Sequence, residues 1–126
     1  MVPDDRRYTQ DHEWVRLDGD EAVVGITAYA ADQLGDIVFV ELPAVGKALE
    51  AAGTFGVVES VKAVSDLFAP VGGEVTATND ALGGSPELVN AEPYEGGWMV
   101  RIRLADPSEI DRLLGPDAYD ALVAAG

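Results

Sequence analysis

The sequence predicts a mainly β fold, α+β in coarse terms, in which two sheets form a flattened β-barrel or sandwich. Short β-rich segments separated by Gly and Pro recur along most of the chain, which is typical of small sandwiches and barrels. One short helix is expected in the N-terminal half and further helices at the C-terminus. At 126 residues the chain is predicted to be one domain, with a core at about 8–105 and C-terminal helices at about 106–125.

The first predicted element is a β-hairpin over residues 12–26. The segments 12–17 and 21–26 have the composition of strands, and they flank Asp18 and Gly19. A tight hairpin turn needs positive φ at its centre, and a sequence of this kind provides it at low cost.

A short helix is predicted next, over residues 27–35. Thr27 is placed to accept a hydrogen bond as the N-cap, and Gly35 to end the helix in a left-handed conformation. A strand then follows over 36–42 and ends before Pro43.

Short strands separated by turns are predicted from 44 to 79. They are 46–52, 54–60, 61–69 and 72–79. A last strand is predicted over 96–104, with one core face and one solvent face. The proposed core face is Val100, Ile102 and Leu104, and the proposed solvent face is Met99, Arg101 and Arg103.

The segment from 106 to 126 is predicted to be helical. Asp106 is expected to cap the first helix, Pro107 to take its first position, and Glu109 to complete a capping box. The pair Gly115-Pro116 is expected to end that helix and begin another.

The charge and composition exclude several functions. With 23 acidic and 8 basic residues, the formal net charge is −15, which disfavours binding to nucleic acid or to an anionic membrane surface. Partners are expected among basic protein surfaces, although a high negative charge also serves solubility. Because the start of the chain lacks an apolar signal region and no run of apolar residues could span a bilayer, the expected location is the cytoplasm.

The sequence offers little for metal binding or catalysis. The chain has no cysteine and a single histidine, His12, and its carboxylates lack calcium-loop spacing, so no metal site is expected. His12 is interpreted as a packed or hydrogen-bonding residue beside Trp14. The "GGSPE" segment is not a nucleophile elbow, and the glycine-rich pieces are interpreted as ordinary turns.

Lys62 lies within the apolar run "GVVESVKAVSD", and an unpaired ammonium is costly to bury. The conflict disappears if the segments around it form a hairpin with Lys62 exposed near the tip. In this interpretation four valines hold the hairpin to the core: Val57, Val58, Val61 and Val64. A lysine at such a tip is either a mount for a modified side chain or an ordinary solubilising residue; Lys47, the other lysine, is interpreted as ordinary surface.

Five segments closely resemble the glycine cleavage system H protein family. They are "YTQDHEWV", "GIT", "LGDIVFVELP", "FGVVESVKAVSDLFAPVGGEV" and "PELVNAEPYEGGWMVRI". The segments match in order, without large gaps, from about Tyr8 to the C-terminal helices. The resemblance implies a flattened sandwich of the lipoyl-domain type, consistent with the fold predicted above.

The resemblance also implies a lipoate cofactor. In the family the lysine of E-S-V-K-A carries (R)-lipoate in amide linkage, which points to Lys62 here. Gly46, Glu59 and Gly73 match the attachment signature, sixteen and three residues before the lysine and eleven after it. The glycines permit turns, and Glu59 offers a charge to the attaching enzyme. A further pair, Glu13 and Asp66, resembles the lining of the cleft in which the family's loaded arm rests.

The family's H protein is a carrier with no catalytic residues of its own. It takes an aminomethyl group from glycine decarboxylase (P protein) to aminomethyltransferase (T protein), and dihydrolipoyl dehydrogenase (L protein) reoxidises it. These three enzymes and a lipoate-attaching enzyme are therefore the implied partners, and a shuttle among them is expected to be a monomer. Alternatives are a relay that passes lipoyl groups to other lipoate-dependent enzymes, and an unmodified β-scaffold that serves only interactions.

Overall fold

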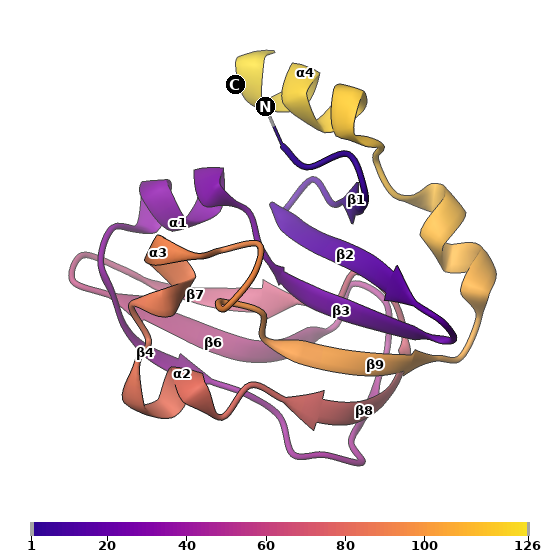
Figure 1. The fold of residues 1–126 in the computed structure, drawn as a ribbon, viewed down its shortest axis with the longest axis horizontal. Helices are drawn as coiled ribbons and strands as arrows, with labels where there is room; N and C mark the ends of the chain where they lie inside the picture. Colours follow the sequence, from indigo (N-terminus) through magenta and orange to yellow (C-terminus); the bar gives the residue numbers. More distant parts are fainter. Residues whose placement is uncertain (1, 126) are drawn as a thin grey trace.

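The computed structural model describes residues 2–125 and has two antiparallel sheets (Figure 1). The larger sheet has the strand order β1-β2-β3-β9-β8-β5, and the smaller has the order β4-β6-β7. The sheets lie one behind the other in Figure 1, with the smaller sheet farther from the viewer. The predicted flattened sandwich is confirmed, and within residues 2–125 the two sheets do not join into a closed barrel.

The larger sheet contains the first predicted hairpin. Its strands are β1 (Arg7–Tyr8), β2 (Glu13–Asp18), β3 (Glu21–Ile26), β5 (Ala48–Leu49), β8 (Gly73–Thr78) and β9 (Val100–Leu104). Asp18 pairs with Glu21 across a two-residue turn. Gly19 takes a φ of 66° there, so the positive φ that the turn signal predicted is present.

The helix predicted after this hairpin is also present, as α1 (Ala28–Leu34). The Ala30 N–H donates to the Thr27 hydroxyl oxygen at 3.2 Å, and Gly35 ends the helix with a φ of 84°. The N-cap is therefore confirmed, and Gly35 ends the helix with a positive φ as expected, although its ψ of −162° lies outside the left-handed helical region.

The smaller sheet consists of β4 (Ile37–Glu41), β6 (Thr54–Ser60) and β7 (Val64–Phe68). The register between β4 and β6 shifts between Ile37 and Phe39, so the strand contains a bulge. The inner side chains of this sheet, such as Val40 and Val58, pack against those of the larger sheet. This contact forms the main hydrophobic core.

A second apolar cluster attaches the two ends of the chain to the outside of the larger sheet. Its buried members are Tyr8, Trp14, Val23 and Tyr119. The last of these comes from α4 (Pro116–Ala125), which Figure 1 shows beside the N-terminal segment. The Arg6 guanidinium lies 4.7 Å from the centre of the Trp14 ring, a cation–π contact that holds the N-terminal segment.

Some local predictions were wrong. The glycine-rich piece at 82–86, interpreted as a turn, overlaps a single-turn helix, α2 (Ala81–Gly84), and a second single-turn helix, α3 (Leu88–Ala91), follows it. Met99, expected on the solvent face, is fully buried. It precedes β9, so the alternation of side chains expected for that strand does not extend to it. Its N–H donates to the Val24 carbonyl of the larger sheet at 2.8 Å.

The C-terminal segment begins as a 3₁₀ helix, η1 (Pro107–Arg112), which Asp106 caps as predicted by accepting from the Ser108 N–H. The predicted capping box does not form. Instead, the Glu109 carboxylate accepts from the Gly72 N–H at 2.9 Å, so it links η1 to the loop before β8. Among residues 2–125, no helix has the length and apolar character needed to cross a bilayer.

Candidate functional site

Lys62 lies in the turn between β6 and β7, as predicted from its sequence context. Glu59 pairs with Val64, and the Ser60 N–H donates to the Ala63 carbonyl at 2.8 Å, which closes the turn. The Ser60 hydroxyl oxygen also accepts from the N–H groups of Lys62 and Ala63, at 3.3 and 3.0 Å. The lysine is exposed, and within residues 2–125 it makes no ion pair. The backbone is therefore fixed while the amine faces solvent.

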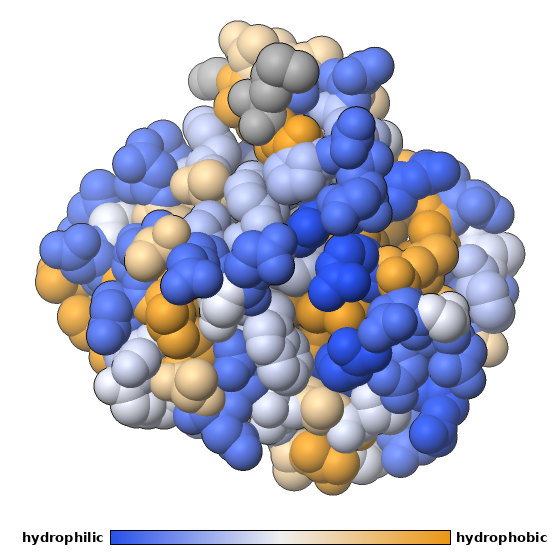
Figure 2. All heavy atoms as spheres, in the orientation of Figure 1, coloured by the Kyte–Doolittle hydropathy of each residue, from blue (hydrophilic) through white to orange (hydrophobic). Residues whose placement is uncertain are grey.

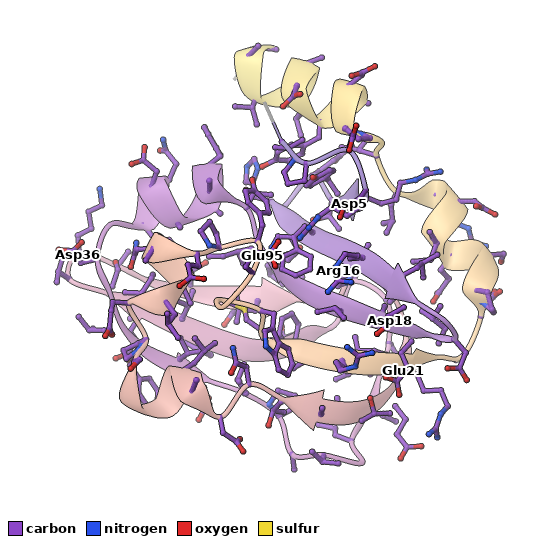
Figure 3. The ribbon with its side chains drawn as sticks, in the orientation of Figure 1. Asp5, Arg16, Asp18, Glu21, Asp36 and Glu95 are labelled. Atoms are coloured by element: carbon purple, nitrogen blue, oxygen red, sulfur yellow. The ribbon has the colours of Figure 1, made fainter. Side chains whose placement is uncertain are left out.

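The turn is also fixed to the neighbouring strand. The Val61 N–H donates to the Asp36 carbonyl at 3.0 Å, and Figure 3 labels Asp36 at the end of the molecule where the β6–β7 loop projects. A Cβ placed on Gly35 would lie 3.2 Å from Cε of Lys62, so the lysine stem rests against this glycine. The absence of a side chain at Gly35 leaves room for the stem.

The expected role of the four valines is only partly correct. Val58 is fully buried and anchors the hairpin, and Val57 is half-buried. Val61 and Val64 instead expose 69% and 67% of their surface. Val61 lies in the turn, and Val64 lies in register with Glu59 on the outer face of the sheet, so neither contacts the core.

The two glycines of the attachment signature lie away from the turn. Gly46 has a φ of 95°, and its N–H donates to the Val75 carbonyl at 2.7 Å. Gly73 begins β8 and pairs with Leu49 and Leu104. Both belong to the β5–β8 end of the larger sheet, whereas Glu59 pairs directly beside the lysine turn in the smaller one. The structure therefore brings Glu59, and not the glycines, next to Lys62.

Replacing Gly73 with Ala is expected to destabilise the fold. A Cβ there would overlap the backbone oxygen of Arg103 and would lie 2.8 Å from Cγ2 of Ile102, and the φ of 152° also disfavours a side chain. We expect a loss of about 2–3 kcal/mol in the free energy of unfolding, measured by urea titration. Gly83→Ala is the matched control, because a Cβ at Gly83 meets nothing within 4 Å. Equal stability of the two variants would contradict this explanation of the signature glycine.

Glu13 is a buried carboxylate near the far end of β7. It is only 2% exposed; the Thr9 hydroxyl donates to it at 2.7 Å and the Phe68 N–H at 3.5 Å. Burial disfavours the ionised form, and it raises the pKa of Glu13 to about 7 despite these two donors. The side chain therefore changes charge near neutral pH.

Glu13 lines a groove of about 250 Å³ that is mostly apolar. Four chain segments contribute to its walls: Thr9, Asp11 and Glu13; Ala51 and Ala52; Phe68, Ala69 and Pro70; Glu109, Arg112 and Leu113. Asp66, which was paired with Glu13 in the sequence interpretation, lies outside this lining. It is exposed on β7, opposite Val57.

His12 is a hydrogen-bonding residue, as expected, but its ring contacts are tyrosines. Its Nδ1 lies 2.7 Å from the Tyr119 hydroxyl, which lies 2.8 Å from the hydroxyl of Thr27. The His12 ring also packs at 4.8 Å, centre to centre, on Tyr29. These contacts tie α4 to the start of α1, and burial lowers the pKa of His12.

The sequence interpretation missed most of the groove. The contribution of η1 could not be seen, because Glu109 and Arg112 are distant in sequence from Glu13. Only Thr9, four residues before the carboxylate, carries a local signal, since a threonine at that spacing can donate to it. Residues 2–125 contain no group of three or more His, Asp or Glu side chains arranged to hold a metal ion.

Comparisons with known proteins agree on one family. Residues 6–125 match the family model described as Glycine cleavage H-protein. The glycine cleavage system H protein of Phenylobacterium zucineum (strain HLK1) is 62% identical over 118 residues, which are 94% of this chain and 98% of that protein. The probable glycine cleavage system H protein of Haloarcula marismortui is 61% identical over 118 residues, with 94% and 93% covered.

A solved structure supports the same comparison. The crystal structure of a glycine cleavage system H protein from Mycobacterium marinum superposes with a TM-score of 0.90 at 38% identity. The superposition covers 98% of this chain and 99% of that one. The likeness therefore includes both sheets and the C-terminal helices.

Proposed function

The chain belongs to the glycine cleavage H-protein family and is a carrier component of the glycine cleavage system, and we propose that Lys62 is the residue to which lipoate is attached. The observation that carries the assignment is the position of this lysine, exposed in a turn whose backbone groups are hydrogen-bonded. Amide formation requires an accessible primary amine, and the hydrogen-bonded turn presents this one at a fixed position on the surface.

The residues present fit such a group. The amine of Lys62 is free of ion pairs within residues 2–125, and the turn places it in solvent. When bound, lipoate supplies a reducible disulfide that can accept a one-carbon amine unit. The rigid β6–β7 turn would hold the attachment point while the arm stays mobile, so delivery within a docked complex becomes effectively intramolecular.

In the groove, the Glu13 carboxylate could bind an amine carried at the end of such an arm. The surface of the groove is mostly apolar, and the Glu13 carboxylate can pair with an ammonium group. Thr9 and the Phe68 N–H orient the carboxylate by donating to its two oxygens. In this proposal Glu13 receives the amine, and Asp66 supplies an exposed negative charge on the strand that leads from Lys62 to Phe68.

The proposed partners are glycine decarboxylase, aminomethyltransferase and dihydrolipoyl dehydrogenase, together with the enzyme that attaches lipoate. The test is reconstitution of glycine decarboxylation from the purified P, T and L proteins with this chain, either lipoylated or not. Carbon dioxide release is expected only with the lipoylated chain and in proportion to its amount. A lipoylated chain that fails to support release, yet passes its lipoyl group to another acceptor, would contradict the shuttle and favour a relay.

A further inference from the structure

The outer face of the smaller sheet has an unusual composition. The register places Phe39, Glu59 and Val64 in one row across the three strands, and Glu41, Val57 and Asp66 in the next. Side chains alternate along a strand, and Val40 and Val58 point inward, so these six point outward. Apolar and acidic side chains therefore alternate on a surface that lies away from the viewer in Figure 1.

Exposed apolar side chains are concentrated on this face and at its lysine end. Four of the seven large apolar side chains that are exposed in residues 2–125 lie here: Val38, Phe39, Val61 and Val64. Together with Val57, Glu41, Glu59 and Asp66, we call these residues the lysine face. On the opposite side of the molecule, Figure 2 shows orange side chains only in small groups separated by blue ones. Such a concentration of exposed apolar side chains is a feature of interaction sites.

The charge of the lysine face indicates what kind of surface it fits. Its carboxylates, Glu41, Glu59 and Asp66, make no ion pair within residues 2–125. By contrast, Asp18 and Glu21, which are labelled in Figure 3, are paired with Arg101. Two basic side chains border the face: Lys62, on the β6–β7 turn, and Lys47, which lines a pocket together with Glu41 and Val57. An apolar partner surface with arginine or lysine side chains at its rim would complement the face.

One partner must contact this region directly. Enzymes that act on the end of an attached arm can dock at a distance from the lysine. The enzyme that attaches lipoate must bring its active site to the bare Nζ of Lys62, so it contacts the residues around that side chain. We propose that the lysine face is the docking surface for the lipoate-attaching enzyme; this inference rests on the proposed function.

Docking serves the formation of a single amide bond. The enzyme supplies lipoate as an activated carboxyl derivative, and Nζ, after losing a proton, attacks the carboxyl carbon. The new amide forms as the activating group leaves with its bonding electron pair. Nothing is oxidised or reduced, and the face contributes binding and orientation only.

The test is the rate of lipoate attachment to the unmodified chain by a purified lipoate–protein ligase with ATP and lipoate, followed by intact mass. Phe39→Thr keeps a residue suited to strands and removes the largest exposed apolar side chain of the face. Leu17→Thr is the matched control, because Leu17 and Phe39 are both 50% exposed and Leu17 lies on the other sheet. We expect kcat/KM to fall about tenfold for Phe39→Thr through a higher KM, and to stay within about twofold for Leu17→Thr.

A second pair of variants tests the charge. Glu41→Lys reverses one carboxylate on the lysine face, and Glu50→Lys makes the same change in net charge at an exposed position in the β5–β6 turn. We expect a roughly tenfold loss of kcat/KM for Glu41→Lys and little change for Glu50→Lys. Thermal unfolding of all four variants should show that each is folded in the assay.

The outcomes separate the two proposals. If the wild-type chain gains the lipoyl mass but Phe39→Thr and Glu41→Lys react as fast as their controls, the docking surface is wrong and the attachment site stands. The same holds if these variants are modified normally but lose only glycine decarboxylation, since the face would then serve another component. If the wild-type chain never gains the mass, the proposed function itself fails.

Discussion

Lys62→Arg is expected to abolish lipoate attachment and, with it, all carrier activity. Arginine keeps the positive charge, but its guanidinium is not a nucleophile at neutral pH, so no amide can form. The side chain is exposed in a turn that is closed by Ser60 and Ala63, so the variant should fold like the wild type. Intact mass after incubation with ligase, ATP and lipoate measures the loss, and glycine decarboxylation with the partner enzymes measures its consequence.

Lys47→Arg is the matched control for this result. Lys47 is the other lysine of the chain and is likewise exposed. This variant should gain the lipoyl mass at the wild-type rate and support carbon dioxide release. If the Lys62→Arg variant still gained the lipoyl mass, or if only the Lys47→Arg variant failed to gain it, Lys62 would not be the attachment site.

Glu13→Gln is expected to remove a pH dependence from the stability of the fold. Burial raises the pKa of Glu13 from 4.5 to about 7. Between these values the folded state binds a proton that the unfolded state has lost, so this group makes the free energy of unfolding fall as pH rises. The shift implies that Glu13 lowers the free energy of unfolding by roughly 2–3 kcal/mol between pH 5 and pH 8.

The measurement is urea unfolding of both proteins at pH 5 and pH 8. Glutamine keeps the shape and can still accept from the Phe68 N–H, so the variant should gain roughly 2–3 kcal/mol over the wild type between the two pH values. Glu50→Gln, an exposed carboxylate, should follow the wild type. A constant difference between Glu13→Gln and the wild type at both pH values would show that Glu13 does not titrate in this range.

The same carboxylate connects stability to the proposed function. An ammonium group beside Glu13 favours the charged form, so an amine that enters the groove would offset the cost of ionisation. In this proposal the groove would therefore bind an arm that carries an amine more tightly than an arm without one.

Local sequence patterns predicted the parts of the molecule that depend on local chemistry. Gly19 and Gly35 take the positive φ that their turn and helix end require, and Thr27 caps α1. The position of Lys62 followed from a conflict between its charge and its apolar neighbours, which only an exposed turn resolves. These features need only a few adjacent residues to specify them.

The features that were missed depend on contacts between distant segments. Val61 and Val64 are as apolar as Val58, and only the turn position and the strand register decide that they face solvent. Met99 is buried in the core, and its N–H donates to the carbonyl of Val24, far earlier in the chain. Glu109 has the sequence position of a capping box but finds the Gly72 N–H instead.

The candidate site divides in the same way. The sequence singled out Glu13 by resemblance, but its burial depends on a groove that four separate segments build. The residues of the lysine face are brought together only by the register of three strands. Neither the buried carboxylate nor the alternating surface could be derived without the tertiary structure.

The most direct test of the central claim is fragment mass analysis of the chain after reaction with lipoate, ATP and a lipoate–protein ligase. The account predicts one lipoyl group per chain, present on fragments that contain Lys62 and absent from fragments that contain Lys47 without Lys62. A chain that stays unmodified while a known acceptor in the same reaction is lipoylated would contradict it, as would a lipoyl group found on any residue other than Lys62.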